Sequence, residues 1–281
     1  MRNFAVSATT ARFRTSLKKP GLAPLALALA LLLTGCGAAS SADSGEPVVV
    51  AAAASLGDAL EDLRPLARAG GLELIANVAG SNVLALQIEA TPAADVFLSA
   101  NQAWIERLAR HGYLRPGTRQ TFLSNRLVVI AHDRRAPPLA QLRDLVVRAR
   151  GNLVLADPRA VPAGRYARSV LEGVTLADGS RAWPLLAPRV VPAADVRAAR
   201  ALVEAQTGSY GIVYATDAEN LREAHIVYQV PRALTPDIRY VAAAVAGRRQ
   251  PARADRFLAL ITSPEAAAIF ARRGFSPPPD A

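Results

Sequence analysis

Short apolar stretches alternate along the chain with amphipathic stretches of helical period. The stretch 48–53 is apolar, and alternate positions are apolar across 72–78. Further strands are predicted at 95–100, 127–131, 153–156, 212–214, 226–230 and 240–246. Apolar residues at helical spacing lie between them, as in Leu56, Leu60 and Leu63 or Val196, Leu202 and Val203. The pattern predicts an α/β chain with largely parallel sheets, in which ligands bind beyond the carboxyl ends of the strands.

Two of the predicted strands turn directly into helices at a serine. Ser55 follows the strand 48–53, and Ser81 follows the strand 72–78. A helix start leaves four backbone amides without partners and carries a partial positive charge, so it suits a small anion. Neither junction contains Lys, Arg or His, which favours recognition of an oxyanion by neutral donors. Each serine alone also fits a helix cap, since Asp58 follows Ser55 at capping-box spacing.

Three later segments offer donors of the same kind. The segment 157–164 follows a strand and opens a helix, so the amide of Ala163 is predicted to be free. Asp195 is a natural N-cap, which leaves the Val196 amide among the first free donors of the next helix. Tyr214 ends a strand with a phenol that can donate into a cleft, although a lone tyrosine there also fits the core.

The first 35 residues read as an export signal. Their basic residues are Arg2, Arg12, Arg14, Lys18 and Lys19, and the apolar stretch 23–33 is too short to span a bilayer. The sequence Leu-Thr-Gly-Cys at 33–36 resembles a bacterial lipobox, so Cys36, the only cysteine, is predicted to carry lipid. The alternative is a signal cut elsewhere that leaves a free thiol. Residues 36–46 are predicted to form a linker.

Charge and motifs disfavour several classes of protein. Half of the formal net charge of +10 belongs to the signal, and the remaining arginines are scattered among acids, which argues against nucleic-acid binding. The chain contains neither G-x-S-x-G nor a P-loop lysine, and its three histidines lack zinc-ligand spacing. A ferric-ion binder would use paired tyrosines, but Tyr210 and Tyr214 are four apart on a predicted strand. We therefore expect neither an enzyme nor a cofactor.

Six motifs occur in the order found in one family of binding proteins. They are AAASL at 52–56, AGSNVLALQIEA at 79–90, ADVFLSANQ at 94–102, DPRAVPAGRYA at 157–167, PAADVRAA at 192–199 and GIVYATDA at 211–218. From 48 to 275 the chain thus resembles the periplasmic molybdate-binding proteins of ABC importers. The resemblance implies that the oxyanion is bound by Ser55, Ser81 and Tyr214 through hydroxyls and by Ala163 and Val196 through backbone amides. Asn82 departs from relatives that have a further hydroxyl residue there.

The resemblance also implies a two-lobed periplasmic-binding-protein fold of type II, with the ligand in the cleft between mainly parallel sheets. The predicted lobes are 47–126 with 232–281, and 127–231. Molybdate and tungstate are bare dianions that only accept hydrogen bonds, whereas monohydrogen phosphate also needs an acceptor. The expected function is capture of molybdate, and of tungstate, by a lipid-anchored monomer that delivers it to the permease and ATPase of an ABC importer. A sulfate binder, separated only by pocket size, and a ligand-sensing domain without transport remain alternatives.

Overall fold

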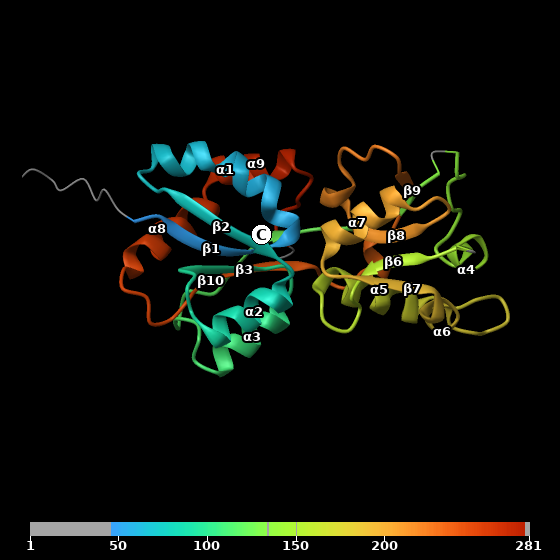
Figure 1. Cartoon of the computed structure of the whole chain (residues 1–281), viewed down its shortest axis with the longest axis horizontal. Coiled ribbons are helices and arrows are strands. Elements are labelled where there is room, and N and C mark those ends of the chain that lie inside the picture. Colours follow the sequence, from blue (N-terminus) through green and yellow to red (C-terminus); the bar gives the residue numbers. More distant parts are fainter. Residues whose placement is uncertain (1–45, 134, 150, 279–281) are drawn as a thin grey trace, which may run out of the picture. The chain divides into compact units, whose positions relative to one another are not determined.

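The computed structural model describes residues 46–133, 135–149 and 151–278 (Figure 1). The predicted signal at 1–35, Cys36 and all but the last residue of the linker 36–46 lie outside the described residues. Among the residues that are described, no helix is both long and apolar enough to cross a bilayer.

The first of two five-stranded sheets has the strand order β2-β1-β3-β10-β4. Its strands are β1 (Val48–Ala53), β2 (Leu74–Ala79), β3 (Val96–Ser99), β4 (Gln120–Ser124) and β10 (Arg239–Ala244). The helices with it are α1 (Gly57–Ala69), α2 (Ser81–Ala90), α3 (Gln102–Arg110), α8 (Pro251–Ile261) and α9 (Pro264–Arg272). Alternate residues of the central strands face opposite ways, because side chains in a strand have a period of two. Phe97 packs with α2 and α3, whereas its neighbours Val96 and Leu98 belong to the cluster that includes α1, α8 and α9.

The second sheet has the order β7-β6-β8-β5-β9. Its strands are β5 (Leu127–Ala131), β6 (Leu153–Ala156), β7 (Val190–Ala193), β8 (Tyr210–Tyr214) and β9 (His225–Gln229). Its helices are α4 (Asp144–Arg148), α5 (Pro162–Gly173), α6 (Ala182–Leu186) and α7 (Val196–Ala205). Four 3₁₀ turns complete the described elements: η1 (Ala54–Leu56), η2 (Ala187–Arg189), η3 (Ala215–Ala218) and η4 (Arg232–Leu234). In Figure 1, α7 lies over one face of this sheet and α5 over the other.

Both sheets are mixed, whereas the sequence predicted mainly parallel ones. In the first, β1 pairs parallel with β2 and β3, and β10 pairs antiparallel with β3 and β4. In the second, β6 is parallel to β7 and β8, and β5 is antiparallel to β8 and β9. The antiparallel pairings involve the strands β4, β5, β9 and β10, which adjoin the two connections between the sheets. The lobe boundaries predicted at 126 and 231 fall in these connections, and the exact division stays a prediction.

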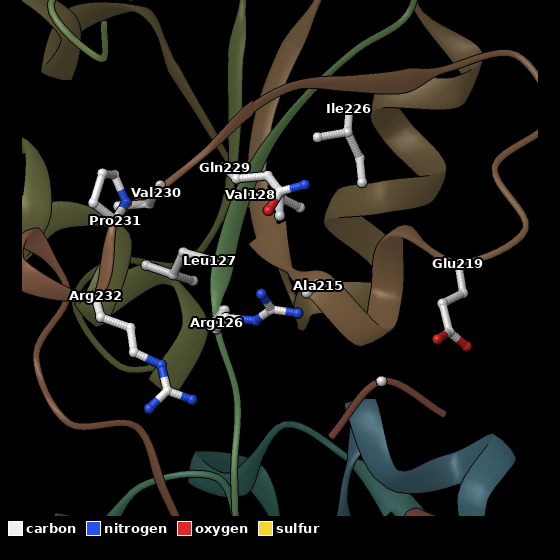
Figure 2. Close-up of a pocket in the computed structure, with 11 residues that line it drawn as sticks. Arg126, Leu127, Val128, Ala215, Glu219, Ile226, Gln229, Val230, Pro231 and Arg232 are labelled. Carbon is white, nitrogen blue, oxygen red and sulfur yellow. The ribbon is translucent and has the colours of Figure 1, made fainter. Parts of the chain in front are cut away.

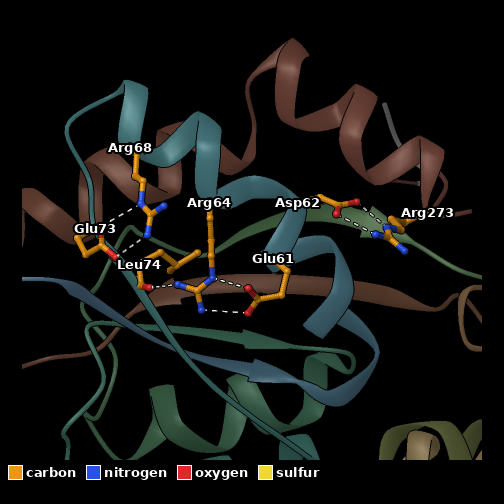
Figure 3. Close-up of polar contacts among 7 residues, drawn as sticks. All are labelled: Glu61, Asp62, Arg64, Arg68, Glu73, Leu74 and Arg273. Atoms are coloured by element: carbon orange, nitrogen blue, oxygen red, sulfur yellow. Dashed lines mark hydrogen bonds and ion pairs between the residues drawn. The ribbon is translucent and has the colours of Figure 1, made fainter.

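Buried leucines and partly exposed ion pairs hold helix α1 against its neighbours. Leu60 and Leu63 are fully buried, and burial of a leucine contributes about 1.5–3 kcal/mol. Arg64 binds Glu61 at 2.5 Å and also the Leu74 carbonyl of β2, while Arg273 after α9 donates to both carboxylate oxygens of Asp62 at 2.6 and 2.8 Å (Figure 3). Exposed pairs add at most about 1 kcal/mol each, so the leucines provide most of the stability. The start of α1, next to Ser55, is thereby fixed.

Candidate functional site

One small cavity is lined by all five residues predicted to bind an oxyanion. Ser55 reaches it from η1, Ser81 and Ala163 from the first turns of α2 and α5, Val196 from the start of α7, and Tyr214 from the end of β8. The remaining lining residues are Ala53, Ala54, Gly80, Ala100, Val161, Pro162 and Asp195. The cavity has a volume of about 10 Å³. It lies beyond the carboxyl ends of β1, β2, β6, β7 and β8, where ligands of α/β sheets bind.

The two serine hydroxyls do not cap helices, so the capping alternative is wrong for both. The N-caps of α1 and α2 are Leu56 and Gly80, and neither makes a side-chain cap hydrogen bond. Ser55 Oγ lies 2.8 Å from Tyr240 Oη, and Ser81 Oγ accepts from the Ala100 amide at 3.2 Å. Because the Ala100 amide can only donate, Ser81 keeps its own proton for another acceptor. The cavity is the space in which that acceptor would lie.

The two predicted amides are free donors at helix starts. In the described part of the chain, the backbone N–H groups of Ala163 and Val196 have no protein acceptor. The prediction that Asp195 caps α7 is confirmed, since its side chain accepts from the Ala198 amide at 2.9 Å. Helix starts concentrate partial positive charge, so both amides present it to the cavity.

Tyr214 brings a phenol that has no partner. Its side chain is 1 % exposed, and within the described residues its Oη forms no hydrogen bond. Leaving a buried hydroxyl unsatisfied costs about 1–3 kcal/mol, so the group is suited to a ligand that accepts its proton. Burial raises the pKa of Tyr214 well above its usual value, so the phenol stays protonated and can donate.

The cavity contains donors but no cation. Of its described lining residues, Asp195 alone is charged, and the Ala198 amide already occupies one of its oxygens. The described residues contain no group of three or more His, Cys, Asp or Glu that could hold a metal. Tyr210, four residues before Tyr214 on β8, does not line the cavity.

A larger cavity of about 560 Å³ lies beside the connections between the sheets and is less suited to a bare anion. Figure 2 shows Arg126 and Arg232 on its wall, with Glu219 at the side. Both arginines are exposed, so water screens their charge. The carboxylate of Glu219 would oppose an anion there. Neutral donors from both sheets converge instead in the smaller cavity.

Contacts between elements of the two sheets flank the smaller cavity. Arg197 at the start of α7 pairs with Asp58 at the start of α1 at 2.7 Å. Asn101 before α3 donates to Tyr166 Oη of α5 at 3.2 Å. Trp104 of α3 donates from its indole to the carbonyl of Ala160 at 3.2 Å. These contacts join the walls of the cavity and keep donors from both sheets facing one another.

Asp217, three residues after Tyr214, is a buried carboxyl with an unpartnered oxygen. Burial raises its pKa from 3.8 to about 7, against the opposing effect of Arg197 and Arg200, while Asp195 and Asp58 raise it further. Between pH 3.8 and about 7 the folded state holds a proton that the unfolded state has lost, so this group stabilises the fold less as the pH rises.

Replacing Asp217 with Asn should remove this dependence. Relative to the Asp217→Asn variant, the wild-type free energy of unfolding should fall by about 1.4 kcal/mol between pH 6 and pH 8. Urea unfolding of both proteins across that range measures the difference, with Asp133→Asn, an exposed site, as the matched control. A difference that stays constant with pH would show that Asp217 does not titrate in this way.

The sequence did not identify three residues that support the donors. Asn125, Tyr240 and the Ala100 amide contact the two serines directly or through one another. Tyr240 lies 185 residues from Ser55 in the chain, so no local spacing connects them. Asn125 lies between β4 and β5 and has no local sequence signal of this role.

Comparison with known proteins identifies the family to which the chain belongs. The family described as bacterial extracellular solute-binding protein matches residues 48–276, and the chain belongs to that family. Among its relatives, the molybdate-binding protein ModA of Escherichia coli is 35% identical over 245 residues, covering 84% of this chain and 90% of the relative. The ModA protein of Haemophilus influenzae is 31% identical over 255 residues, covering 89% and 97%. The solved periplasmic molybdate-binding protein of Azotobacter vinelandii superposes with a TM-score of 0.70 at 22% identity, covering 82% of this chain and 99% of that one, which shows the shared two-lobed fold.

Proposed function

We propose that this protein binds molybdate, and tungstate, outside the cytoplasmic membrane and delivers it to an ABC permease and its ATPase. The main observation in support is that five neutral donors from both sheets line one small cavity that contains no Lys, Arg or His among its described residues. We assign the oxyanion to the hydroxyls of Ser55, Ser81 and Tyr214 and to the amides of Ala163 and Val196. The relatives whose names state molybdate binding support the choice of ligand.

The donor set matches a fully deprotonated tetrahedral dianion. Such an ion accepts hydrogen bonds at every oxygen and offers none, and each charge-assisted bond is worth roughly 1.5–3 kcal/mol net. Several of these bonds together offset the cost of removing a dianion from water. Monohydrogen phosphate would bring a proton of its own, whereas the five assigned groups are all donors. Sulfate has the same charge and is smaller, so cavity size must separate it from molybdate.

The proposal extends to the part of the chain outside the described residues. Cys36 is proposed as the lipidated first residue of the mature protein, joined to the binding domain through the linker that ends at residue 46. The domain would then act as a membrane-anchored monomer near its permease. Closure of the two sheets on the anion would be the change that the permease recognises.

Side-by-side calorimetric titration with molybdate, tungstate and sulfate tests the ligand. Binding of the first two with much weaker binding of sulfate is expected. Ser55→Ala and Ser81→Ala should each weaken molybdate binding roughly tenfold to a hundredfold, because each removes one charge-assisted donor. Ser169→Ala, an exposed serine of α5, is the control and should leave the affinity unchanged.

The possible results of these titrations test the identity of the ligand and the assignment of the binding site separately. Tight sulfate binding without molybdate binding would make the protein a sulfate binder. Molybdate binding that persists unchanged in both cavity serine variants would disprove the site assignment while leaving the ligand intact. No binding of any of the three anions would contradict the proposed function itself.

A further inference from the structure

We propose that Tyr240 and Asn125 are positioning residues that fix the direction of the Ser55 hydroxyl, so that its single proton points into the cavity and the site favours unprotonated oxyanions. The inference rests on the proposed function and adds a specificity mechanism to it. It depends on a buried chain of hydrogen bonds whose donors and acceptors can be assigned one after another.

The assignment begins at the backbone amide of Arg126, which can only donate. It lies 2.8 Å from Asn125 Oδ1, so that side-chain atom must be the carbonyl oxygen. The other atom, Nδ2, then carries two protons. One is donated to Thr216 Oγ1 at 2.9 Å and the other to Tyr240 Oη at 3.2 Å. The hydrogen-bonding groups of the Asn125 amide are thereby used in a single orientation.

The direction of the hydrogen bond between Tyr240 and Ser55 follows from the same reasoning. Tyr240 Oη accepts from Asn125, and its neighbour at 2.8 Å is Ser55 Oγ. If Ser55 donated to Tyr240, the phenol proton would be buried without a partner, at a cost of about 1–3 kcal/mol. Tyr240 therefore donates to Ser55. The Ser55 oxygen is then an acceptor within the protein, and its own proton is left for the cavity that it lines.

The surroundings of Tyr240 hold its ring in place and keep it neutral. The side chain is fully buried, and its ring packs edge-on against Phe275 at 5.4 Å and tilted against Tyr214 at 6.0 Å. The register of β10 against β4 shifts between Tyr240 and Val241, an irregularity of the kind that redirects side chains. Burial raises the pKa of Tyr240, so the phenol keeps the proton that it donates.

Ser81 independently shows the same arrangement. Its oxygen accepts from the Ala100 amide, a group that cannot accept in return. Both cavity serines thus receive a hydrogen bond from the protein and have one proton free. With one lone pair already in use, each serine presents its proton to the cavity and is a weaker acceptor for a ligand that itself carries a proton, which disfavours hydrogen phosphate.

A double-mutant cycle tests whether Tyr240 acts through Ser55. Tyr240→Phe should weaken molybdate binding about tenfold in the wild-type background, because Ser55 loses the donor that orients it. In the Ser55→Ala background the same substitution should have little effect, since residues in one network are not additive. Equal losses in both backgrounds would overturn the proposal. Tyr228→Phe, a half-buried tyrosine of β9, is the control.

The ratio of molybdate to phosphate affinity provides a second test, because a purely structural role of Tyr240 would not change it. In mildly alkaline buffer, hydrogen phosphate has the same charge as molybdate, so general electrostatic effects cancel in the ratio of their affinities. Tyr240→Phe should lower the molybdate-to-phosphate affinity ratio at least several-fold, because the freed hydroxyl can turn and accept. An unchanged ratio, with both affinities reduced in parallel, would contradict the assigned direction.

The substitution Asn125→Asp should reverse the direction of the hydrogen bonds through Tyr240 to Ser55, with a side chain of nearly the same shape. A carboxylate at this position has no proton to donate, so it would accept from Tyr240, and Ser55 would then donate to Tyr240 instead of to the cavity. The same fall in the affinity ratio is expected, and a ratio equal to that of the wild type would again overturn the proposal. Failure of the wild-type protein to bind molybdate would instead contradict the proposed function, so the two failures are distinguishable.

Discussion

Val196→Pro should lower molybdate affinity about a hundredfold or more while leaving the fold intact. The substitution removes one charge-assisted donor, worth roughly 1.5–3 kcal/mol, and places a ring carbon where the anion would lie. Val196 is the first residue of α7, a position where proline is well tolerated because its amide has no partner within the helix. Asp195 before it has φ −154° and ψ −178°, an extended conformation that suits a residue preceding proline.

The chain already contains the same arrangement elsewhere. Helix α9 begins at Pro264 after the N-cap Ser263, whose side chain accepts from the Ala266 amide. Val196→Ala is the matched control, because it keeps the amide and removes only part of the side chain. Titration should show near wild-type affinity for the alanine variant and a large loss for the proline variant. Wild-type affinity in a folded Val196→Pro protein would exclude the amide as a ligand.

Local sequence patterns predicted the donor-bearing junctions because each is a local event. A strand that turns into a helix is encoded within a few residues, and so is the Asp195 cap, which the structure confirms. The five donors line one cavity because the ends of β1, β2, β6, β7 and β8 meet there. That convergence follows from the α/β architecture, so a correct fold class was sufficient to bring the residues together.

The missed elements are those whose local pattern is weak. Strand β7 contains Pro192, which argues against a central strand, and the structure places β7 at the edge of its sheet, where proline is tolerated. Strand β4 begins with Gln120 and Thr121 and is also an edge strand. Its antiparallel pairing with β10 depends on where the chain crosses between the sheets. Neither the periodicity nor the spacing of apolar residues encodes that crossing.

The hydrogen bonds that hold the donors in place could not be predicted from local sequence patterns, for a different reason. Ser55, Asn125 and Tyr240 come from three distant segments, and each has an ordinary alternative role in its own segment. The Ser55 capping box was such an alternative, and it is wrong because η1 is inserted before α1 and shifts the N-cap to Leu56. Only tertiary contacts distinguish a serine that caps a helix from one that faces a ligand.

Gly164→Ala is expected to destabilise the protein and weaken binding together. A Cβ at this position would lie 1.9 Å from the carbonyl oxygen of Ala156 and 2.7 Å from its carbonyl carbon. Both atoms are backbone at the end of β6, so no side chain can turn away. The start of α5 must move from the strand, and it carries the Ala163 amide with it. We expect a loss of at least about 3 kcal/mol, a melting temperature lower by about 6–12 °C, and molybdate affinity lower at least about tenfold.

The far end of the same helix supplies the control. A Cβ at Gly173, the last residue of α5, would meet nothing within 4 Å. Gly173→Ala should therefore leave binding unchanged and should stabilise the helix by up to about 1 kcal/mol, because alanine has the higher helix propensity. Thermal melts with and without molybdate compare the two variants. If Gly164→Ala melted and bound like Gly173→Ala, the close approach of α5 to β6 would not be what holds the Ala163 amide at the cavity.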